Sequence, residues 1–402
     1  MQKYSKIFIG IPILREFENI ELLLNNLKSQ TFKDFRIVVC INQPENWWND
    51  AEKEKYCIDN QKTIEKLKEE KNLQITIIDK SSKGNGWQGK EKGVGWARKL
   101  IFEEILKQAK DKDIIISLDA DTSFSENYTK SIYNNFKENP HIGGLVVPYY
   151  HRLNKSSEQN RQILHYEIYM KYYLLNLLRI HSPFAFTALG SAIAFTADTY
   201  RKIGGITPVE AGEDFYLIQK ICKKSQILLW NSEYVYPSAR VSDRVPFGTG
   251  QAVNKTIEES IVLYPLYSGE SFDKIKESYE LFPCLFEAEI DMPITLFLKQ
   301  QLKTENLWES LRKNFKTKEK FVKACHERFD GLRILQFLRV NQPEQFFSEK
   351  EIQQFFMKEY QKEVDDFFFK DCSIEFLSSM RDFLLERELE ARKRHDNLLK
   401  NK

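Results

Sequence analysis

The sequence predicts an α/β protein whose mostly parallel sheet carries flanking helices, as in Rossmann-like folds. Three short apolar runs read as buried strands: Lys6–Ile11, Arg36–Ile41 and Leu73–Ile78. The first two strands are separated by apolar residues at helical spacing between Ile20 and Leu27, and the second and third by a helical pattern over Glu52–Glu70. Strands that alternate with helices favour a parallel sheet with crossover helices.

The composition changes after about residue 251, which predicts a second region. Residues 1–251 contain the strand patterns and most of the glycines. Residues 252–402 are rich in Lys, Glu and Phe with helical periodicity, and Arg381–Lys402 is strongly charged. We therefore expect an α/β domain over residues 1–251 and a mainly α-helical C-terminal region over residues 252–402.

Charge and cysteine usage exclude several classes of protein. The 402 residues include 60 basic and 58 acidic side chains, so the net charge of +2 does not suit a general nucleic-acid binder. The six cysteines are scattered without a Cys-x-x-Cys pair, which indicates neither a disulfide framework nor a zinc site. No signal peptide is apparent, and the weakly polar run Phe184–Ala197 is too short to span a bilayer. These features predict a cytoplasmic protein.

The stretch Asp113–Asp121 is the centre of the functional interpretation. An apolar run reads as a buried strand that ends in Leu-Asp-Ala-Asp. Because side chains in a strand alternate faces, Asp119 and Asp121 are expected to share one side of it, with Ala120 on the other. Hard divalent cations such as Mg²⁺ or Mn²⁺ prefer oxygen ligands, so the pair is a candidate metal site. The alternative is a strand end with two solvated acids.

Other polar residues follow the remaining predicted strands. Pro12, Asn42 and Asp79 stand at the same ends as Asp119 and Asp121. Ligands of open parallel sheets bind at the carboxyl ends of the strands. These positions are therefore expected to border one ligand site.

A glycine-rich segment lies between the third predicted strand and the next helix. Five of the 16 glycines fall between Gly84 and Gly95, with Lys90 and Arg98 close by. Backbone N–H groups of such a loop can approach phosphate, and a helix start favours anions. The alternative is a flexible, solvated loop. The segment also matches the first seven positions of a P-loop, but Glu91 stands where Ser or Thr must bind Mg²⁺.

Two later segments carry further candidates. Glu213 and Asp214 follow Gly212 at the predicted start of a helix, where acids are also common for electrostatic reasons alone. The polar segment from Ser238 to Gln251 either closes over a phosphate through Arg240, Arg244 and Thr249 or is a linker between domains.

Together these residues resemble the glycosyltransferases of family 2, which have the GT-A nucleotide-diphospho-sugar transferase fold. The resemblance covers roughly residues 6–251. Its parts, in order, are Pro12 with Glu16, the segment Gly93–Lys99, Leu118–Asp121, and Gly212–Asp214. Asn42 stands where the family usually has an aspartate, and the Gln-x-x-Arg-Trp motif of processive members is absent. The resemblance therefore implies a non-processive enzyme.

The resemblance implies a role for each matched residue. Asp119 and Asp121 would bind a divalent cation, Mn²⁺ or Mg²⁺, and the donor diphosphate. Asp214 would be the catalytic base of an inverting transfer, with Glu213 beside it. The expected donor-binding residues are Pro12, Glu16, Asn42, Asp79, Lys90, Arg98, Asp119, Gly190, Ser191 and Arg244.

The expected partners and the rival functions are classes rather than single molecules. The donor would be a nucleotide sugar, and the acceptor a glycan, a lipid-linked molecule or a small molecule. The C-terminal helices could contact the inner face of a membrane or a second copy of the chain. The rival functions are a nucleotidyltransferase, although Pro12–Glu18 lacks its basic, glycine-rich motif, and a non-catalytic relative that binds a protein partner.

Overall fold

The computed structural model describes residues 6–209, 212–239, 264, 266–342 and 348–400, and they fall into two compact units. The sheet unit comprises Met1–Ile163, Thr187–Val262 and Arg392–Lys402. The helical unit comprises Leu164–Phe186 and Leu263–Ala391. The division is thus discontinuous along the chain, in contrast to the single cut at residue 251 that composition suggests.

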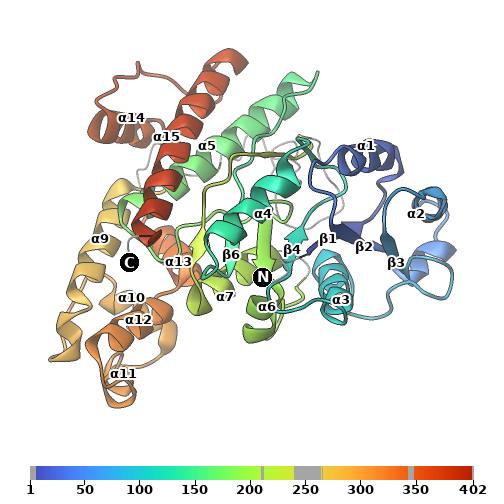
Figure 1. Ribbon diagram of the computed structural model, residues 1–402. Helices are drawn as coiled ribbons and strands as arrows, with labels where there is room; N and C mark the ends of the chain where they lie inside the picture. The colour runs from blue at the N-terminus through green and yellow to red at the C-terminus, as the bar shows by residue number, and fades with distance from the viewer. Residues whose placement is uncertain (1–5, 210–211, 240–263, 265, 343–347, 401–402) are drawn as a thin grey trace. The chain divides into compact units, whose positions relative to one another are not determined.

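The sheet unit contains a seven-stranded sheet in the order β3-β2-β1-β4-β7-β6-β8 (Figure 1). β1 is parallel to β2 and β4, β2 to β3, and β6 to β8, whereas β7 is antiparallel to both of its neighbours. The predicted α/β class with a mostly parallel sheet is confirmed. The strands are β1 (Ile7–Ile13), β2 (Phe35–Asn42), β3 (Ile75–Lys80), β4 (Ile114–Ser117), β6 (Gly144–Val146), β7 (Ile193–Thr196) and β8 (Ile227–Leu228).

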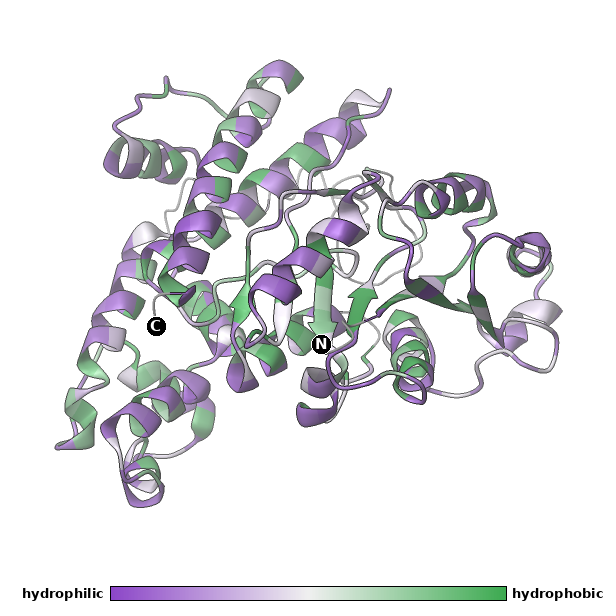
Figure 2. Cartoon of the chain, in the orientation of Figure 1, coloured by the Kyte–Doolittle hydropathy of each residue, from purple (hydrophilic) through white to green (hydrophobic). Residues whose placement is uncertain are grey.

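The inner strands form because their side chains are apolar on both faces. Every residue of β1 and β4 is buried, as expected for a parallel sheet that is covered on both sides. β3 lies at an edge and is only partly buried. Figure 2 shows the contrast between the apolar strands and the helices, on which hydrophilic and hydrophobic residues alternate.

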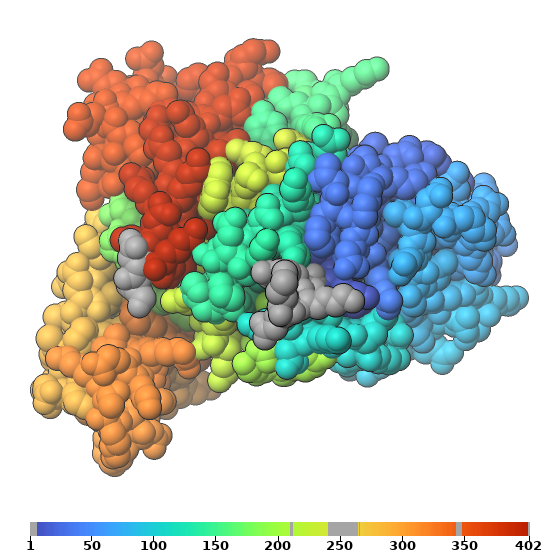
Figure 3. Space-filling model, in the orientation of Figure 1, coloured from blue at the N-terminus to red at the C-terminus, as the bar shows by residue number. Residues whose placement is uncertain are grey.

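Helix α3 (Val94–Leu106) packs on β1 and β2 and brings its first turns to the carboxyl ends of these strands. Gly10 permits this contact, because a Cβ there would lie 2.6 Å from Cγ2 of Ile101. The other helices of the sheet unit are α1 (Phe17–Lys28), α2 (Glu54–Glu69), α4 (Tyr128–Glu138), α6 (Ala197–Lys202) and α7 (Glu213–Lys224). In Figure 3, α1 and α2 (blue) and α4 (teal) form a continuous surface on the viewed face of this unit.

The last turns of α15 (Ile374–Lys400) belong to the sheet unit. Arg392 is fully buried and donates to the carbonyl oxygens of Val146 (2.9 Å) and Leu229 (2.7 Å), at the ends of β6 and β8. Asp396, one helical turn later, accepts from the backbone N–H of Leu229 at 3.0 Å. Residues near the C-terminus therefore satisfy backbone groups of the sheet that carries the candidate site.

The helical unit confirms the predicted helical C-terminal region. Its helices are the later part of α5 (Ser157–Arg179), α9 (Gly269–Leu281), α10 (Thr295–Leu302), α11 (Glu309–Asn314), α12 (Lys318–Arg328), α13 (Gly331–Val340), α14 (Ser348–Tyr360) and most of α15. Many of its phenylalanines form the core, although Phe368 is 61% exposed. Among the helices that the structure describes, none combines the length and the apolar character that crossing a membrane requires.

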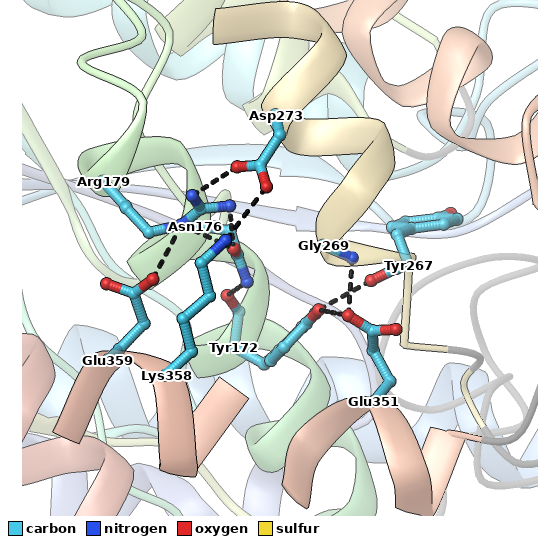
Figure 4. A network of polar contacts seen from close by, with 9 residues as sticks. All are labelled: Tyr172, Asn176, Arg179, Tyr267, Gly269, Asp273, Glu351, Lys358 and Glu359. Carbon is cyan, nitrogen blue, oxygen red and sulfur yellow. Dashed lines mark hydrogen bonds and ion pairs between the residues drawn. The ribbon is translucent and has the colours of Figure 1, made fainter. Parts of the chain in front are cut away.

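Polar networks join the helices of this unit. Arg179 of α5 binds Asp273 of α9 at 2.5 Å, and Lys358 of α14 reaches the same carboxylate at 3.1 Å (Figure 4). Glu351 of α14 accepts from the backbone N–H of Gly269, the first residue of α9. A buried pair, Arg381 with Glu167 at 3.1 Å, ties α15 to α5. These contacts set the register of the helices within this unit.

The role of Arg392 leads to a stability prediction. Arg392→Met should lower the free energy of unfolding by about 2–4 kcal/mol, because two buried carbonyl groups lose their donor. The matched control is Arg394→Met, two residues away on the exposed face of α15. Chemical denaturation of both variants decides the matter: equal stability would show that Arg392 does not hold the sheet.

Candidate functional site

The two acids of Leu-Asp-Ala-Asp lie in a turn rather than in a strand. β4 ends at Ser117, opposite the first residue of β7, Ile193, so it has no antiparallel partner beyond that point. The expectation that the strand runs to Asp121 and places both acids on one strand face is therefore wrong. The backbone N–H of Thr122 donates to the carbonyl of Asp119 at 3.2 Å, which closes the turn. Asp119 and Asp121 are both half-buried in it.

Arg98, on the second turn of α3, connects this acidic turn with the start of α7. Its Nη2 lies 2.5 Å from Oδ1 of Asp119, and its Nη1 donates to Oε1 of Glu213. The Arg98 side chain is 5% exposed and that of Glu213 is 3% exposed, whereas that of Asp119 is 33% exposed. One buried guanidinium thus joins the two acidic motifs that the sequence places far apart.

Glycines at three positions make this arrangement possible. A Cβ at Gly95 would lie 2.3 Å from the carbonyl oxygen of Val209, so α3 approaches the segment that leads to α7 only without a side chain there. A Cβ at Gly190 would lie 2.0 Å from Nη2 of Arg98. Gly212 has φ +81°, in the left-handed region that favours glycine, and directly precedes α7.

The electrostatics of the cluster favour further positive charge. Burial lowers the pKa of Arg98, but the charges of Asp119 and Glu213 raise it by more. The guanidinium therefore stays protonated. Burial raises the pKa of Glu213 to about 7 against the opposing effect of Arg98, and burial likewise raises that of Asp214. Three carboxylates around one arginine leave an excess of negative charge, which attracts a proton or a cation.

The acidic turn has donor atoms that suit a hard divalent cation. Oδ2 of Asp119 has no hydrogen-bond or ion-pair partner among the described residues, and Asp121 lies two positions further in the same turn. Within the described part of the chain, no group of three or more His, Cys, Asp or Glu residues could enclose an ion. Mg²⁺ is typically bound by one or two carboxylates together with substrate phosphates, so these two residues fit such a cation.

Two expected nucleotide contacts are engaged within the protein. Asn42 is buried; its Nδ2 donates to the carbonyl of Ile13 at 3.0 Å, and its Oδ1 accepts from Nε1 of Trp87 at 3.1 Å. Oδ1 of Asp79 accepts from the backbone N–H groups of Ser81 and Ser82, both at 2.9 Å. Although burial acts in the opposite direction, these hydrogen bonds lower the pKa of Asp79, so it is ionised.

The glycine-rich loop is held by a carboxylate that the sequence analysis missed. Glu45 accepts from the backbone N–H of Gly84 at 2.8 Å and from that of Gly86 at 2.7 Å. These N–H groups were expected to face phosphate. Lys90, further along the loop, is exposed to solvent. Glu45 begins the short 3₁₀ helix Glu45–Asn49 after β2, 39 residues before Gly84. No local sequence pattern predicts a contact between residues so far apart.

The other predicted donor residues lie at or near the same strand ends. Pro12 is buried in β1 opposite Cys40, and the buried Glu16 accepts from Nδ2 of Asn19 at 2.7 Å. Ser191, beside Gly190, is buried, and its hydroxyl has no partner among the described residues. The predicted lid residues Arg240, Arg244 and Thr249 lie outside the described residues.

Comparisons with known proteins give similarity only to solved structures. No protein-family model matches the chain, and no curated protein matches it. The chain is similar to residues 1–349 of S. aureus TarS in complex with UDP-GlcNAc, at 14% identity and a TM-score of 0.42, over 98% of this chain and 92% of that one. It is also similar to the mannosyltransferase PcManGT from Pyrobaculum calidifontis in complex with GDP-Man and Mn²⁺, at 12% identity and a TM-score of 0.39, over 98% and 87%.

A third solved structure is GalNAc-T7 with UDP, GalNAc and Mn²⁺, at 11% identity and a TM-score of 0.40 over 85% of this chain and 59% of that one. Likenesses at this level of identity and TM-score fix neither a donor nor an acceptor for the present chain.

The close approach of Gly190 to Arg98 can be tested directly. Gly190→Ala should lower the free energy of unfolding by about 1–3 kcal/mol, the usual cost of overpacking a buried site. In an Arg98→Ala background the same substitution should cost much less, because the clashing group is gone. Thermal or chemical unfolding of both singles and the double variant measures this; strictly additive effects would mean that the guanidinium is not what Gly190 accommodates.

Proposed function

We propose that the chain is a glycosyltransferase that moves a sugar from a nucleoside-diphosphate donor to an acceptor hydroxyl, with inversion at the anomeric carbon and a divalent cation at Asp119 and Asp121. The observation that carries the proposal is the Arg98 link between the acidic turn after β4 and the acidic start of α7. Sugar transfer needs one acidic group for a cation and the donor diphosphate and another for the acceptor proton. Arg98 contacts the first at Asp119, and its second partner, Glu213, directly precedes Asp214, to which we assign the acceptor proton.

The chemistry follows from the residues of the cluster. Asp119 and Asp121 would hold the divalent cation, which would neutralise the charge that grows on the departing diphosphate. Asp214 accepts the proton of the acceptor hydroxyl, which is a poor nucleophile until that proton is removed. Asp214 suits this role because it is half-buried and its Oδ1 already accepts from the backbone N–H of Phe215, which fixes its carboxylate. Attack from the face opposite the diphosphate inverts the configuration.

The glycine-rich loop supports this reading over functions that cradle a triphosphate. Its N–H groups at Gly84 and Gly86 hold Glu45, so an entering phosphate would have to displace a carboxylate. The same loop carries Trp87, whose Nε1 binds Asn42 at the end of β2. In this proposal the loop does not bind phosphate as a P-loop does; its Trp87 borders the nucleoside site at the end of β2.

Donor binding provides the first test. Nucleotide sugars are screened with Mn²⁺ by thermal shift, since a ligand that binds only the folded state stabilises it by about 2.7 kcal/mol at a concentration of 100 times its Kd. Asp121→Asn should remove the Mn²⁺-dependent part of this stabilisation, because the cation loses a charged ligand. The exposed Asp34→Asn is the matched control. A full Mn²⁺-dependent shift in Asp121→Asn would contradict the assigned metal ligand.

Transfer itself provides the second test. Asp214→Asn keeps the shape of the side chain and removes its basic oxygen, so transfer of the radiolabelled sugar should fall ~10²–10⁴-fold. Donor affinity should stay near that of the unmodified chain. If no nucleotide sugar is turned over with any offered glycan, lipid-linked or small-molecule acceptor, while donors bind, a non-catalytic role replaces this proposal.

A further inference from the structure

Glu213 and Asp214 are neighbours with the same charge but with different surroundings. Glu213 is buried, and its Oε1 accepts a hydrogen bond from Nη1 of Arg98. Asp214 is half-buried and forms no ion pair within the described residues; its Oδ1 accepts a hydrogen bond from the backbone N–H of Phe215. Their different surroundings indicate different roles for Glu213 and Asp214 in the site.

We propose that Glu213 anchors Arg98 instead of accepting a proton, and that Arg98 is a positioning residue that couples the Asp119 turn to the start of α7. This inference rests on the proposed function for its meaning, because it assigns the roles within that site. The shared guanidinium carries it: Nη2 faces Asp119, Nη1 faces Glu213, and the fork between them is planar and rigid.

The coupling has a defined physical route. Arg98 divides its charge between two carboxylates, and the backbone at Gly190 lies against its Nη2, which leaves it no room to move in that direction. When Glu213 loses its charge, Asp119 is the ion-pair partner of the guanidinium that remains among the described residues, and Asp214 acts on it only at longer range. Asp119 then becomes a weaker ligand for a cation, although Glu213 itself does not touch that cation. Asp214 forms no ion pair with Arg98 within the described residues and acts on the guanidinium only at longer range, so its loss should disturb the Arg98–Asp119 pair less.

The first experiment measures Mn²⁺ affinity without substrate, by the decrease of the free Mn²⁺ signal in electron paramagnetic resonance. Glu213→Gln should weaken Mn²⁺ binding by about 5–30-fold, in the range of ordinary coupling between sites. Asp214→Asn should change it by less than about threefold. Equal affinities in the unmodified chain and in Glu213→Gln would overturn the coupling.

The second experiment needs neither metal nor turnover. In mildly alkaline buffer, Arg98→Met should lower the melting temperature by about 5–10 °C, because it leaves the buried Glu213 carboxylate without its partner. Adding Glu213→Gln should recover most of this loss, since the orphaned charge is gone. Adding Asp214→Asn instead should recover little. Equal recovery by the two second substitutions would contradict the anchor role.

The outcomes separate this inference from the proposed function. If the chain binds no nucleotide sugar or no Mn²⁺, the proposed function fails, and the melting-temperature cycle still decides whether Glu213 anchors Arg98. If sugar is transferred and Glu213→Gln abolishes transfer while Asp214→Asn does not, Glu213 is the base and the inference is wrong. If Asp214→Asn abolishes transfer while Glu213→Gln leaves measurable transfer with weaker Mn²⁺ dependence, the inference holds.

Discussion

A buried arginine among carboxylates is the interaction on which the candidate site depends. Arg98 sits where water cannot solvate it, so its charge is tolerated only because Asp119 and Glu213 meet it directly. The reverse also holds, because Glu213 is buried and needs the guanidinium. Neither partner could be retained alone without a large cost. The acidic turn and the start of α7 are therefore held in a fixed relation before any ligand arrives, which is the preorganisation that catalysis by charge requires.

The rest of the local structure follows from the need to bring that guanidinium into place. α3 must lie close to the sheet and to the segment before α7, and Gly10 and Gly95 each remove a side chain at a point of contact. Gly190 then gives the guanidinium the volume that a Cβ would occupy. At each of these three positions a Cβ would lie too close to a neighbouring atom, which explains the glycine. The glycine-rich loop is held in a different way: its N–H groups at Gly84 and Gly86 donate to Glu45, and Nε1 of its Trp87 donates to Asn42.

Much of the fold could be predicted from the sequence, because buried parallel strands and amphipathic helices have strong local patterns. β1, β2 and β3 begin and end within two residues of the expected ranges. β4 ends earlier than its apolar pattern suggests, since the position of β7 is set by long-range pairing. The acids of the site were also recognisable. What could not be read from the sequence is that Arg98 binds Glu213 across 115 residues, or that Glu45 holds the loop, because these contacts depend on the packed fold.

The discontinuous sheet unit places a further constraint on the site. Arg392 and Asp396 satisfy backbone groups of Val146, the last residue of β6, and of Leu229, which follows β8. β6 pairs with β7, which is itself paired with β4. The strand before the acidic turn therefore belongs to a hydrogen-bonded sheet whose far end is completed by the last turns of the chain. A boundary drawn by composition would remove those turns and leave buried carbonyl groups without donors. The sheet unit thus combines Thr187–Val262 with Arg392–Lys402, which the helical unit separates in the sequence.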